Sequence, residues 1–393
     1  MKVTAITAYV VKADTGYYPV NAKRAGAELF GTDYFRIPPY SQLYSRKAES
    51  VIIKVETDAG ITGWGESQAP VGPEIVATIV EKIVGPVLLG RDPLDIGVLF
   101  TEMTGTSRNR GHTGSYQMDA IAGLDTALWD IRGKLEDKPL SSLLGGRYRN
   151  ALPSYASGLR SETPAARRDE ALSRVAAGFG IKPFLSGDWK RAADEMAQLR
   201  EAVGNDAPLF ADGLWSFTMP DAALLGASLE DSGFNFFECP GDPEDIIGHA
   251  RLAQKLRIPI AIGETLRTRN EFLPWLQGGA LAICQPDIAR IGVSESMAIA
   301  ALAETFNVPT APHIGACTIV GMATTWQISS AIPNFLIKEH QPVMFDVFNR
   351  WLAEPLVIEN GQLVVPEGPG IGVTILEEEL ARDVVSSVTI RSD

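Results

Sequence analysis

From about residue 151 onward, the sequence repeats one unit, a short apolar run followed by an amphipathic stretch of helical periodicity. Each apolar run predicts a strand, and helices are expected between most of them. The eight predicted strands are Leu152–Ala156, Ile181–Phe184, Leu209–Ala211, Asn235–Phe237, Pro259–Ile262, Leu281–Cys284, Pro309–Ala311 and Phe335–Lys338. Eight strands alternating with helices over roughly 190 residues predict a closed parallel barrel.

The residues before the barrel have a different pattern, with strands first and helices after them, which is typical of an α+β unit. The predicted elements are strands Val3–Val11, Glu49–Thr57 and Ile61–Glu66 and helices Pro73–Val84, Leu94–Met103 and Ser115–Leu135. After the barrel, strand-like runs flank a turn at Glu359-Asn360-Gly361, and this tail could pack back on the first unit. We therefore expect a capping domain at residues 1–130, a barrel at 131–350 and a C-terminal segment at 351–393 that returns to the cap.

Polar residues follow the barrel strands, and active sites of parallel barrels lie at the C-terminal ends of their strands. After strands 2 to 8 these residues are Lys182, Asp212, Glu238, Glu264, Asp287, His313 and Glu339. From Asp212 onward they are spaced by 26, 26, 23, 26 and 26 residues, about one strand-plus-helix unit each. We expect them to converge on one barrel mouth.

Three of these residues, Asp212, Glu238 and Glu264, are carboxylates on consecutive strands. Carboxylates held close together repel one another unless a cation lies between them. A set of oxygen ligands with room for water suits Mg²⁺. The alternative is that each acid caps a helix or pairs with an arginine, but three matching positions in consecutive units favour a magnesium site.

Asp287 and His313 follow neighbouring strands, so the carboxylate can accept one imidazole N–H and raise the basicity of the other nitrogen. This pair predicts a general acid/base, with a buried structural histidine as the alternative. Glu339 could be a second polar partner across the mouth from this pair, or it could cap a helix. Lys182 could lie beside anionic oxygens of a substrate, or extend along the barrel rim.

Residues 17–47 form a long irregular stretch that is rich in aromatic residues. Five basic residues against two acidic ones give it a charge of +3, in a chain of net charge −13. Such a loop predicts a lid over an anionic substrate, with a solvated loop or a subunit contact as alternatives. Candidate substrate contacts are Arg24, Arg36 and Tyr44, together with Trp215 after the third barrel strand, and Gly105–Gly114 is a second candidate loop.

The acidic balance argues against nucleic-acid and anionic-membrane partners, which bind basic surfaces. No uncharged apolar stretch of 18 or more residues occurs, and the N-terminus reads as a strand rather than a secretion signal. Three cysteines without metal-binding spacing fit a reducing, cytoplasmic setting. We expect a homo-oligomeric enzyme that acts on a small carboxylate.

Several motifs together resemble one family. They are Thr57–Glu66 (Thr-Asp-Ala-Gly-Ile-Thr-Gly-Trp-Gly-Glu), the helix Ala127–Lys134 leading to Leu143–Gly146, Gly263-Glu264-Thr265, Gln285-Pro286-Asp287 and Ala311-Pro312-His313. With these motifs the chain resembles the enolase superfamily, and within its mandelate racemase/muconate lactonizing enzyme family the mandelate racemase subgroup of acid-sugar dehydratases. The segment Ile332–Glu339 is similar to the galactonate dehydratase type.

The resemblance implies an α/β fold, a modified TIM barrel of the (β/α)7β kind, with an α+β capping domain built from both termini. It also implies Mg²⁺ on Asp212, Glu238 and Glu264, a His313–Asp287 dyad and Glu339 as the acid opposite. The sequence departs from the subgroup at three points: Phe184 replaces a second lysine base, Leu214 replaces a general-acid histidine, and Cys239 follows Glu238.

The chemistry that the resemblance implies is abstraction of the proton next to a carboxylate, giving an enediolate. Because Phe184 leaves one face of the carbon without a base, we predict a lyase: β-elimination of water with His313 as acid/base, giving a 2-keto-3-deoxy acid. Alternatives are an epimerase or racemase, a lactone cycloisomerase, or a non-catalytic relative. A glycoside hydrolase is less consistent with His313 and a third acid at Glu264.

Overall fold

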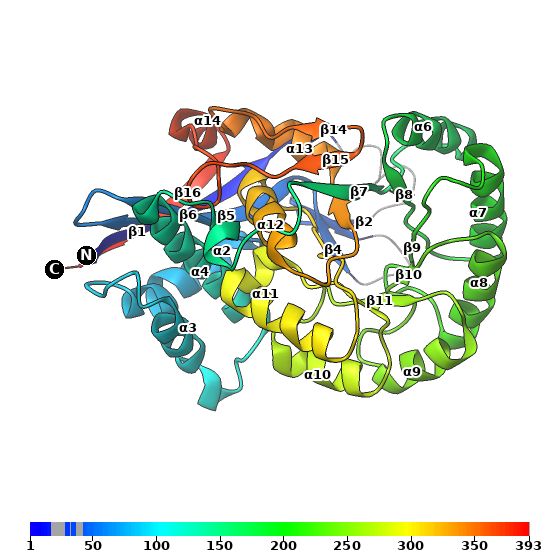
Figure 1. Ribbon diagram of the computed structural model, residues 1–393, viewed down its shortest axis with the longest axis horizontal. Helices are drawn as coiled ribbons and strands as arrows, with labels where there is room; N and C mark the ends of the chain where they lie inside the picture. Colours follow the sequence, from blue (N-terminus) through cyan, green and yellow to red (C-terminus); the bar gives the residue numbers. More distant parts are fainter. Residues whose placement is uncertain (17–27, 32, 37–41, 393) are drawn as a thin grey trace.

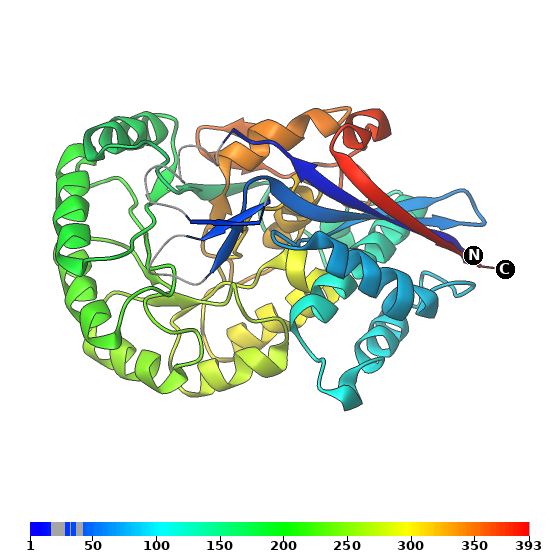
Figure 2. The same ribbon diagram turned by 180° about the vertical axis from the view of Figure 1, so that it is seen from behind.

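A computed structural model describes residues 1–16, 28–31, 33–36 and 42–392. Figures 1 and 2 show a barrel ringed by helices beside a smaller sheet-and-helix unit, with both chain termini on the smaller unit. The expected fold class, a parallel barrel with an α+β cap, is confirmed. Among the described residues, no helix has the length and apolar character needed to cross a membrane.

The cap contains a four-stranded antiparallel sheet in the order β16-β1-β5-β6. Its strands are β1 (Val3–Ala13), β5 (Ala48–Thr57), β6 (Thr62–Ser67) and β16 (Val384–Arg391), and its main helices are α2 (Pro73–Ile79), α3 (Ile96–Gly105) and α4 (Ser115–Glu136). Gly63 and Gly65 let β6 lie directly against α4, because a Cβ at either position would fall within 2.1 Å of a helix carbonyl oxygen. The two glycines of the Thr57–Glu66 motif are therefore required for packing.

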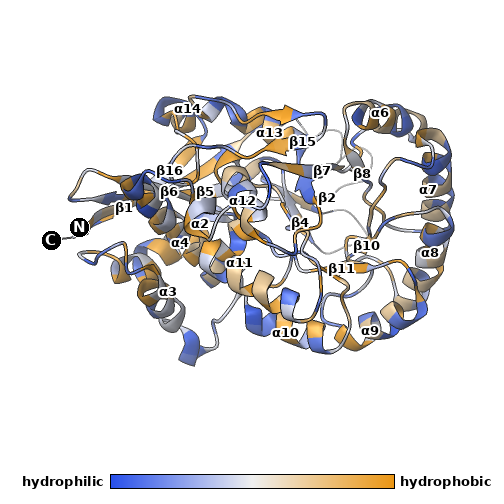
Figure 3. Ribbon diagram, viewed as in Figure 1, coloured by the Kyte–Doolittle hydropathy of each residue, from blue (hydrophilic) through white to orange (hydrophobic). Residues whose placement is uncertain are grey.

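The barrel ring consists of β7 (Ala151–Ser157), β8 (Gly180–Lys182), β9 (Ala211–Asp212), β10 (Phe237–Glu238), β11 (Ile260–Ile262), β12 (Ile283–Cys284), a single bridged residue at Thr310, and β13 (Lys338–His340). Parallel pairing of β13 with β7 closes the ring. The alternating helices are α6 (Pro164–Ala176), α7 (Trp189–Val203), α8 (Met219–Asp231), α9 (Ile246–Lys255), α10 (Arg269–Gln277), α11 (Ile288–Thr305) and α12 (Ile319–Ala331). The helices α6 to α10 carry hydrophilic and hydrophobic residues side by side, as expected for helices with one face on a barrel (Figure 3).

Two strand predictions need correction. The seventh strand, expected over Pro309–Ala311, is reduced to bridges from Thr310 to Cys284 and to Phe335. Proline has no N–H to donate to a ladder, and Pro309 and Pro312 flank this position. The eighth strand lies at Lys338–His340, at the end of the expected run Phe335–Lys338, because these polar residues are buried and pair with β7.

Aromatic side chains fill the barrel below its mouth. The rings of Tyr155 and Phe210 lie 4.8 Å apart, and those of Phe210 and Phe236 lie 4.5 Å apart. All three side chains are buried. This apolar floor confines charged groups inside the barrel to the end at which the strands finish.

The C-terminal segment contacts both parts of the molecule. After α13 (Pro342–Phe348), a hairpin of β14 (Ile358–Glu359) and β15 (Gln362–Val364) pairs with β7. The short helix α14 (Glu377–Ala381) follows, and β16 then pairs with β1 of the cap. We retain the division of the chain at residues 130 and 350 as a proposal, and note that α4 continues past residue 130.

Candidate active site

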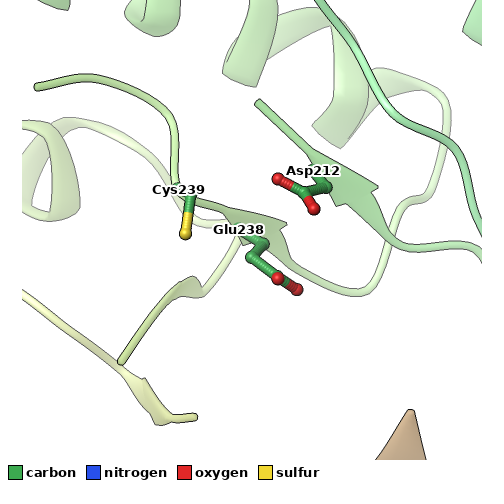
Figure 4. A group of neighbouring side chains, drawn as sticks. All are labelled: Asp212, Glu238 and Cys239. Atoms are coloured by element: carbon green, nitrogen blue, oxygen red, sulfur yellow. The ribbon is translucent and has the colours of Figure 1, made fainter. Parts of the chain in front are cut away.

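The three predicted metal ligands come from the neighbouring parallel strands β9, β10 and β11. Asp212 and Glu238 are register partners, and Glu264 follows β11 by two residues. Ligand atoms of Asp212, Glu238 and Cys239 lie within 4.8 Å of one another (Figure 4). Glu238, Glu264 and His313 form a second such group, so Glu238 links the two.

Cys239 is not a suitable magnesium ligand, although it belongs to one of these groups. Burial raises the pKa of the Cys239 thiol well above its usual value, and the charges of Glu264 and Glu238 raise it further. Magnesium prefers oxygen ligands and is bound by carboxylates. The oxygen set of Asp212, Glu238 and Glu264 therefore fits Mg²⁺ better than a set that includes the thiol.

Lys182 lies beneath these carboxylates and is fully buried. Its Nζ is 2.7 Å from Glu238 Oε1, 2.8 Å from Glu339 Oε1 and 3.4 Å from Asp212 Oδ2. Burial opposes the charged ammonium, but the charges of Glu238 and Glu339 outweigh it and raise the pKa of Lys182 well above its usual value. The ammonium thus offsets the negative charge of the site and does not extend along the barrel rim.

Burial and mutual repulsion act on the carboxyl groups beside Lys182. Burial, followed by the charge of Glu238, raises the pKa of Asp212 well above its usual value. Burial also raises the pKa of Glu238, although Lys182 acts in the opposite direction. A divalent cation between these groups would favour their ionised forms and relieve the repulsion.

The predicted acid/base pair consists of Asp287, after the sixth strand position of the ring, and His313, after the seventh. His313 Nδ1 lies 2.8 Å from Asp287 Oδ2, while its Nε2 lies 3.0 Å from Glu264 Oε2 and 3.7 Å from Glu339 Oε2. Burial disfavours the imidazolium, but Glu339 and the hydrogen bond to Asp287 raise the pKa of His313 well above 6.5. One ring nitrogen is thus oriented by Asp287, and the other faces the carboxylate cluster.

Glu264 and Glu339, on either side of His313 Nε2, are both stabilised as carboxylates. Burial opposes ionisation of Glu264, but a hydrogen bond from His313 lowers its pKa to about 2. Burial also opposes ionisation of Glu339, but the charges of Lys182 and His313 lower its pKa to about 2. The histidine therefore lies between two negative groups.

Two cap residues without a clear functional signal in the sequence support this dyad. With its amide oriented to satisfy its neighbours, Gln68 donates to both oxygens of Asp287, at 2.9 and 2.8 Å, and accepts from the N–H of Ala316 at 3.2 Å. Glu66 accepts from the N–H and hydroxyl groups of Thr318 at 2.8 and 2.6 Å and from the Gly321 N–H at 2.8 Å, at the first turn of α12. The cap thus holds the loop between His313 and α12.

The one signal for these two residues in the sequence is their spacing. Glu66 ends the Thr57–Glu66 motif, and Gln68 follows two positions later, so both would point to the same side of an extended chain. That spacing does not indicate which distant loop they contact, which lies roughly 250 residues later.

Two further side chains hold the predicted metal ligands. Gln285 Nε2 donates to Glu238 Oε2 at 2.7 Å, while Lys182 occupies the other oxygen of Glu238. Trp215 Nε1 donates to Glu264 Oε1 at 2.5 Å. Trp215, predicted as a substrate contact, therefore lies against a predicted metal ligand.

The predicted lid residues are placed differently from the strand-end residues. Arg24 lies outside the described residues. Arg36 is on β3 (Tyr34–Arg36), where its Nη2 pairs with Glu28 at 2.6 Å, and Tyr44 on β4 (Leu43–Ser45) stacks on Phe35. Their described contacts are thus within the small sheet formed by β2 (Glu28–Phe30), β3 and β4, which Figure 2 shows in front of the barrel. In the second candidate loop, Arg108, Arg110 and His112 are exposed.

The structure therefore brings together all seven residues predicted from the strand ends. They are Lys182, Asp212, Glu238, Glu264, Asp287, His313 and Glu339, with Trp215 beside them. A carboxylate cluster next to a histidine–aspartate pair can hold a cation and transfer a proton at the same place.

Comparison with known proteins matches both parts of the chain to known domain families. Residues 40–145 match the N-terminal domain of mandelate racemase/muconate lactonizing enzymes, and residues 166–379 match the enolase C-terminal domain-like family. Three relatives are a D-galactarolactone cycloisomerase of Agrobacterium fabrum (33% identity, 86% of this chain and 92% of the relative), an arabinonate dehydratase of Saccharolobus solfataricus (34%, 83% and 88%) and a D-galactonate dehydratase of Verminephrobacter eiseniae (32%, 87% and 91%).

Solved structures agree with the fold. A member of the enolase superfamily from Agrobacterium tumefaciens superposes with a TM-score of 0.92 at 29% identity, covering 99% of both chains. A racemase from Streptomyces coelicolor A3(2) with bound magnesium superposes with a TM-score of 0.83 at 26% identity, covering 98% of this chain and 100% of that one.

Proposed function

Because the chain belongs to the mandelate racemase/muconate lactonizing enzyme family of the enolase superfamily, we propose that it is a lyase that removes water from a sugar acid. The product is a 2-keto-3-deoxy acid. Relatives at 31–34% identity are named as arabinonate, xylonate and galactonate dehydratases, which supports this reaction. The observation that carries the proposal is the contact of the His313–Asp287 pair with the carboxylate cluster.

Asp212, Glu238 and Glu264 are the residues that would hold Mg²⁺. When bound, the cation supplies electrostatic stabilisation for the negative charge that develops on the substrate carboxylate. The oxygen donor set supports this assignment, as does the relative in which magnesium is bound. Lys182 and Gln285 each hold one oxygen of Glu238, which keeps that carboxylate oriented.

His313 performs the proton transfers in this proposal. A cation held by Glu264 would offset part of the negative charge that raises the His313 pKa, and so would favour the neutral ring. In that form Asp287 holds Nδ1–H, and Nε2 takes the proton from the carbon next to the substrate carboxylate. The C–O bond at the next carbon then breaks, and the proton on Nε2 goes to the departing hydroxyl group, which leaves as water. The resulting enol converts to the 2-keto acid.

Phe184 supports elimination over racemisation. It follows β8 and bridges to Asp212, so an apolar ring stands at the end of this strand. Racemisation needs an acid or base on each face of the carbon, whereas dehydration can use one histidine for both proton transfers.

The test is a screen of sugar acids in the presence of Mg²⁺, with detection of 2-keto acids. We expect at least one acid to lose water, and His313→Asn to lower kcat by about 10²- to 10⁴-fold. The control is His112→Asn, since the side chain of His112 is exposed. An unchanged rate in His313→Asn, or full activity after removal of divalent cations with EDTA, would contradict the mechanism.

A cycloisomerase is a second candidate, because a relative at 33% identity is named for that reaction. The reaction in D₂O separates the two. Loss of water with formation of a 2-keto acid supports dehydration, whereas an isomer of unchanged mass, apart from deuterium incorporation, supports cycloisomerisation or epimerisation.

We also propose a cytoplasmic location and a homo-oligomeric state. Three buried free cysteines, Cys239, Cys284 and Cys317, support a reducing compartment. Light scattering of the purified protein tests the oligomeric state.

A further inference from the structure

Arg160 lies across the barrel mouth from Glu264, one of the predicted metal ligands. It follows β7, the first strand of the ring, whereas Glu264 follows β11, the fifth. In a closed ring of eight strand positions, the first and the fifth are diametrically opposite. An elongated molecule with one end at Glu264 would therefore point its other end toward Arg160.

A row of polar contacts connects these two sides. Glu264 Oε2 lies 3.0 Å from His313 Nε2, which lies 3.7 Å from Glu339 Oε2. The other oxygen of Glu339 is 3.4 Å from Gln341 Nε2, and Gln341 Oε1 accepts a hydrogen bond from Arg160 Nη2 at 3.2 Å. The acid/base histidine is thus between the cation-binding side and the guanidinium.

The guanidinium of Arg160 is held in place by its surroundings. Its Cζ lies 5.3 Å from the centroid of the Phe184 ring. Gln341 is fixed in turn, because its Nε2 donates to the carbonyl of Ile314 at 3.0 Å. The backbone N–H of Arg160 donates to Glu170 Oε2 at 2.8 Å, which anchors the loop after β7.

The loop before Arg160 also brings its backbone close to Phe184. Gly158 has φ of 74°, and a Cβ there would lie 2.7 Å from the Phe184 ring and 3.1 Å from the Arg160 guanidinium. Only glycine suits both this conformation and this spacing. Gly158 therefore lets the backbone of this loop pack against both Phe184 and Arg160.

The chemistry of this arrangement suits an anion. Gln341 is neutral, so the hydrogen bond that orients the guanidinium is made by a group without charge. Arginine binds carboxylates through two parallel N–H groups, which gives both affinity and orientation.

We propose that Arg160, supported by Phe184 and Gln341, binds a second carboxylate at the far end of the substrate, so that the substrate is a sugar diacid. This inference rests on the proposed function, because it assumes that the first carboxylate lies at the cation side and that C2 lies beside His313. A sugar monoacid with a terminal hydroxyl group would lack the group that the guanidinium binds.

The test compares diacids with monoacids that have the same configuration at C2 to C5 and differ at C6 alone. We expect the wild type to favour the diacid. Arg160→Met should lower kcat/KM for the diacid by about 10- to 100-fold, the range expected for a lost hydrogen-bonded charge. It should change kcat/KM for the monoacid by less than threefold, and Arg160→Lys should recover part of the loss.

The matched control is Arg168→Met, which removes the same charge from α6, where Arg168 Nη1 donates to Gln198. It should leave the diacid preference intact. Wild-type preference for monoacids, or an equal loss for both classes in Arg160→Met, would overturn the inference.

Binding separates this inference from the proposed function. Calorimetry with His313→Asn measures affinity for the diacid and the monoacid without turnover. Tighter binding of the diacid that depends on Arg160 would support the inference even if no acid loses water. Equal binding of both classes would overturn it even if dehydration is observed.

Discussion

Lys182 shows how one side chain can organise a site without projecting into it. Its ammonium lies within 3.4 Å of carboxylate oxygens from Asp212, Glu238 and Glu339. Buried charges are tolerated when they are paired, and the loss of one partner leaves the others without compensation. Lys182 therefore stabilises the cluster before a cation binds.

Replacing Lys182 tests this role. We expect Lys182→Met to lower the free energy of unfolding by about 3 to 5 kcal/mol in metal-free buffer, because the carboxylates lose their buried cation. Mg²⁺ should recover part of the loss, so the rise in Tm on adding Mg²⁺ should be larger than in the wild type. Lys190→Met is the control, since Lys190 is exposed. Wild-type stability in the metal-free variant would contradict the interpretation.

Among the elements, cap side chains hold the N-terminal turns of barrel helices. Glu66 of β6 accepts hydrogen bonds from the first turn of α12. Asp125 of α4 accepts from the N–H and hydroxyl groups of Ser294 at 2.8 and 2.6 Å, next to Gly292, where φ of 78° interrupts α11. In each case a carboxylate satisfies the free N–H groups of a helix start.

Asp125 gives this contact a pH dependence. Burial raises its pKa from 3.8 to about 6, although the hydrogen bonds from Ser294 act in the opposite direction. A carboxyl group with a raised pKa in the folded state contributes stability that is fully present below pH 3.8 and is lost as pH rises through 6. The free energy of unfolding of the wild type, minus that of Asp125→Asn, should therefore fall by about 3 kcal/mol over this range.

Urea unfolding at pH 4, 5, 6 and 7 measures this difference. Subtracting the variant removes the contributions of the other titrating groups, which both proteins share. Asp137→Asn, at the exposed C-terminus of α4, is the control for removing a carboxyl group of the same helix outside this contact. A difference that rises with pH for Asp125→Asn would show that its carboxylate stabilises the fold.

At the scale of the whole molecule, cap and barrel share buried polar contacts. Asp119 of α4 lies 2.7 Å from Arg267 and 3.3 Å from Arg290, which follow β11 and β12. Asp130 accepts from the N–H groups of Trp64 in the cap and Ile371 in the C-terminal segment. Separation of the two parts would leave these charges without their partners.

We therefore expect cap and barrel to unfold together. Differential scanning calorimetry should give one transition with equal calorimetric and van't Hoff enthalpies. Asp119→Asn should lower the Tm of that transition without splitting it. Two resolved transitions in the wild type would show that the interface does not couple the parts.

The sequence predicted the barrel and most of its mouth because both depend on local pattern. Alternation of apolar runs with helical periodicity identifies the strands, and the residue after a parallel strand lies at the mouth whatever the rest of the chain does. Asp212, Glu238, Glu264, Asp287, His313 and Glu339 could therefore be located by spacing. The seventh strand was overestimated, because Pro309 and Pro312 flank Thr310, the one residue of the expected run that forms bridges.

Contacts between distant segments could not be read in this way. Gln68 contacts Asp287, Glu66 contacts Thr318, and Arg160 contacts Gln341 across roughly 180 to 250 residues of chain. Neither partner of such a pair carries a local signal that points to the other. The sequence also did not show what the predicted lid side chains contact. Arg36, predicted as a substrate contact, pairs with Glu28 of the same small sheet.

The sequence by itself determined the fold class, the family motifs and the residues that end each barrel strand, because short-range periodicity and chain direction fix these features. The tertiary structure alone decided what each of these residues contacts. It placed Lys182 beneath the carboxylates, joined the cap to the His313 loop and brought Arg160 to the side of the mouth opposite Glu264. The physical reason is that ring closure and domain docking bring together atoms that no local pattern relates.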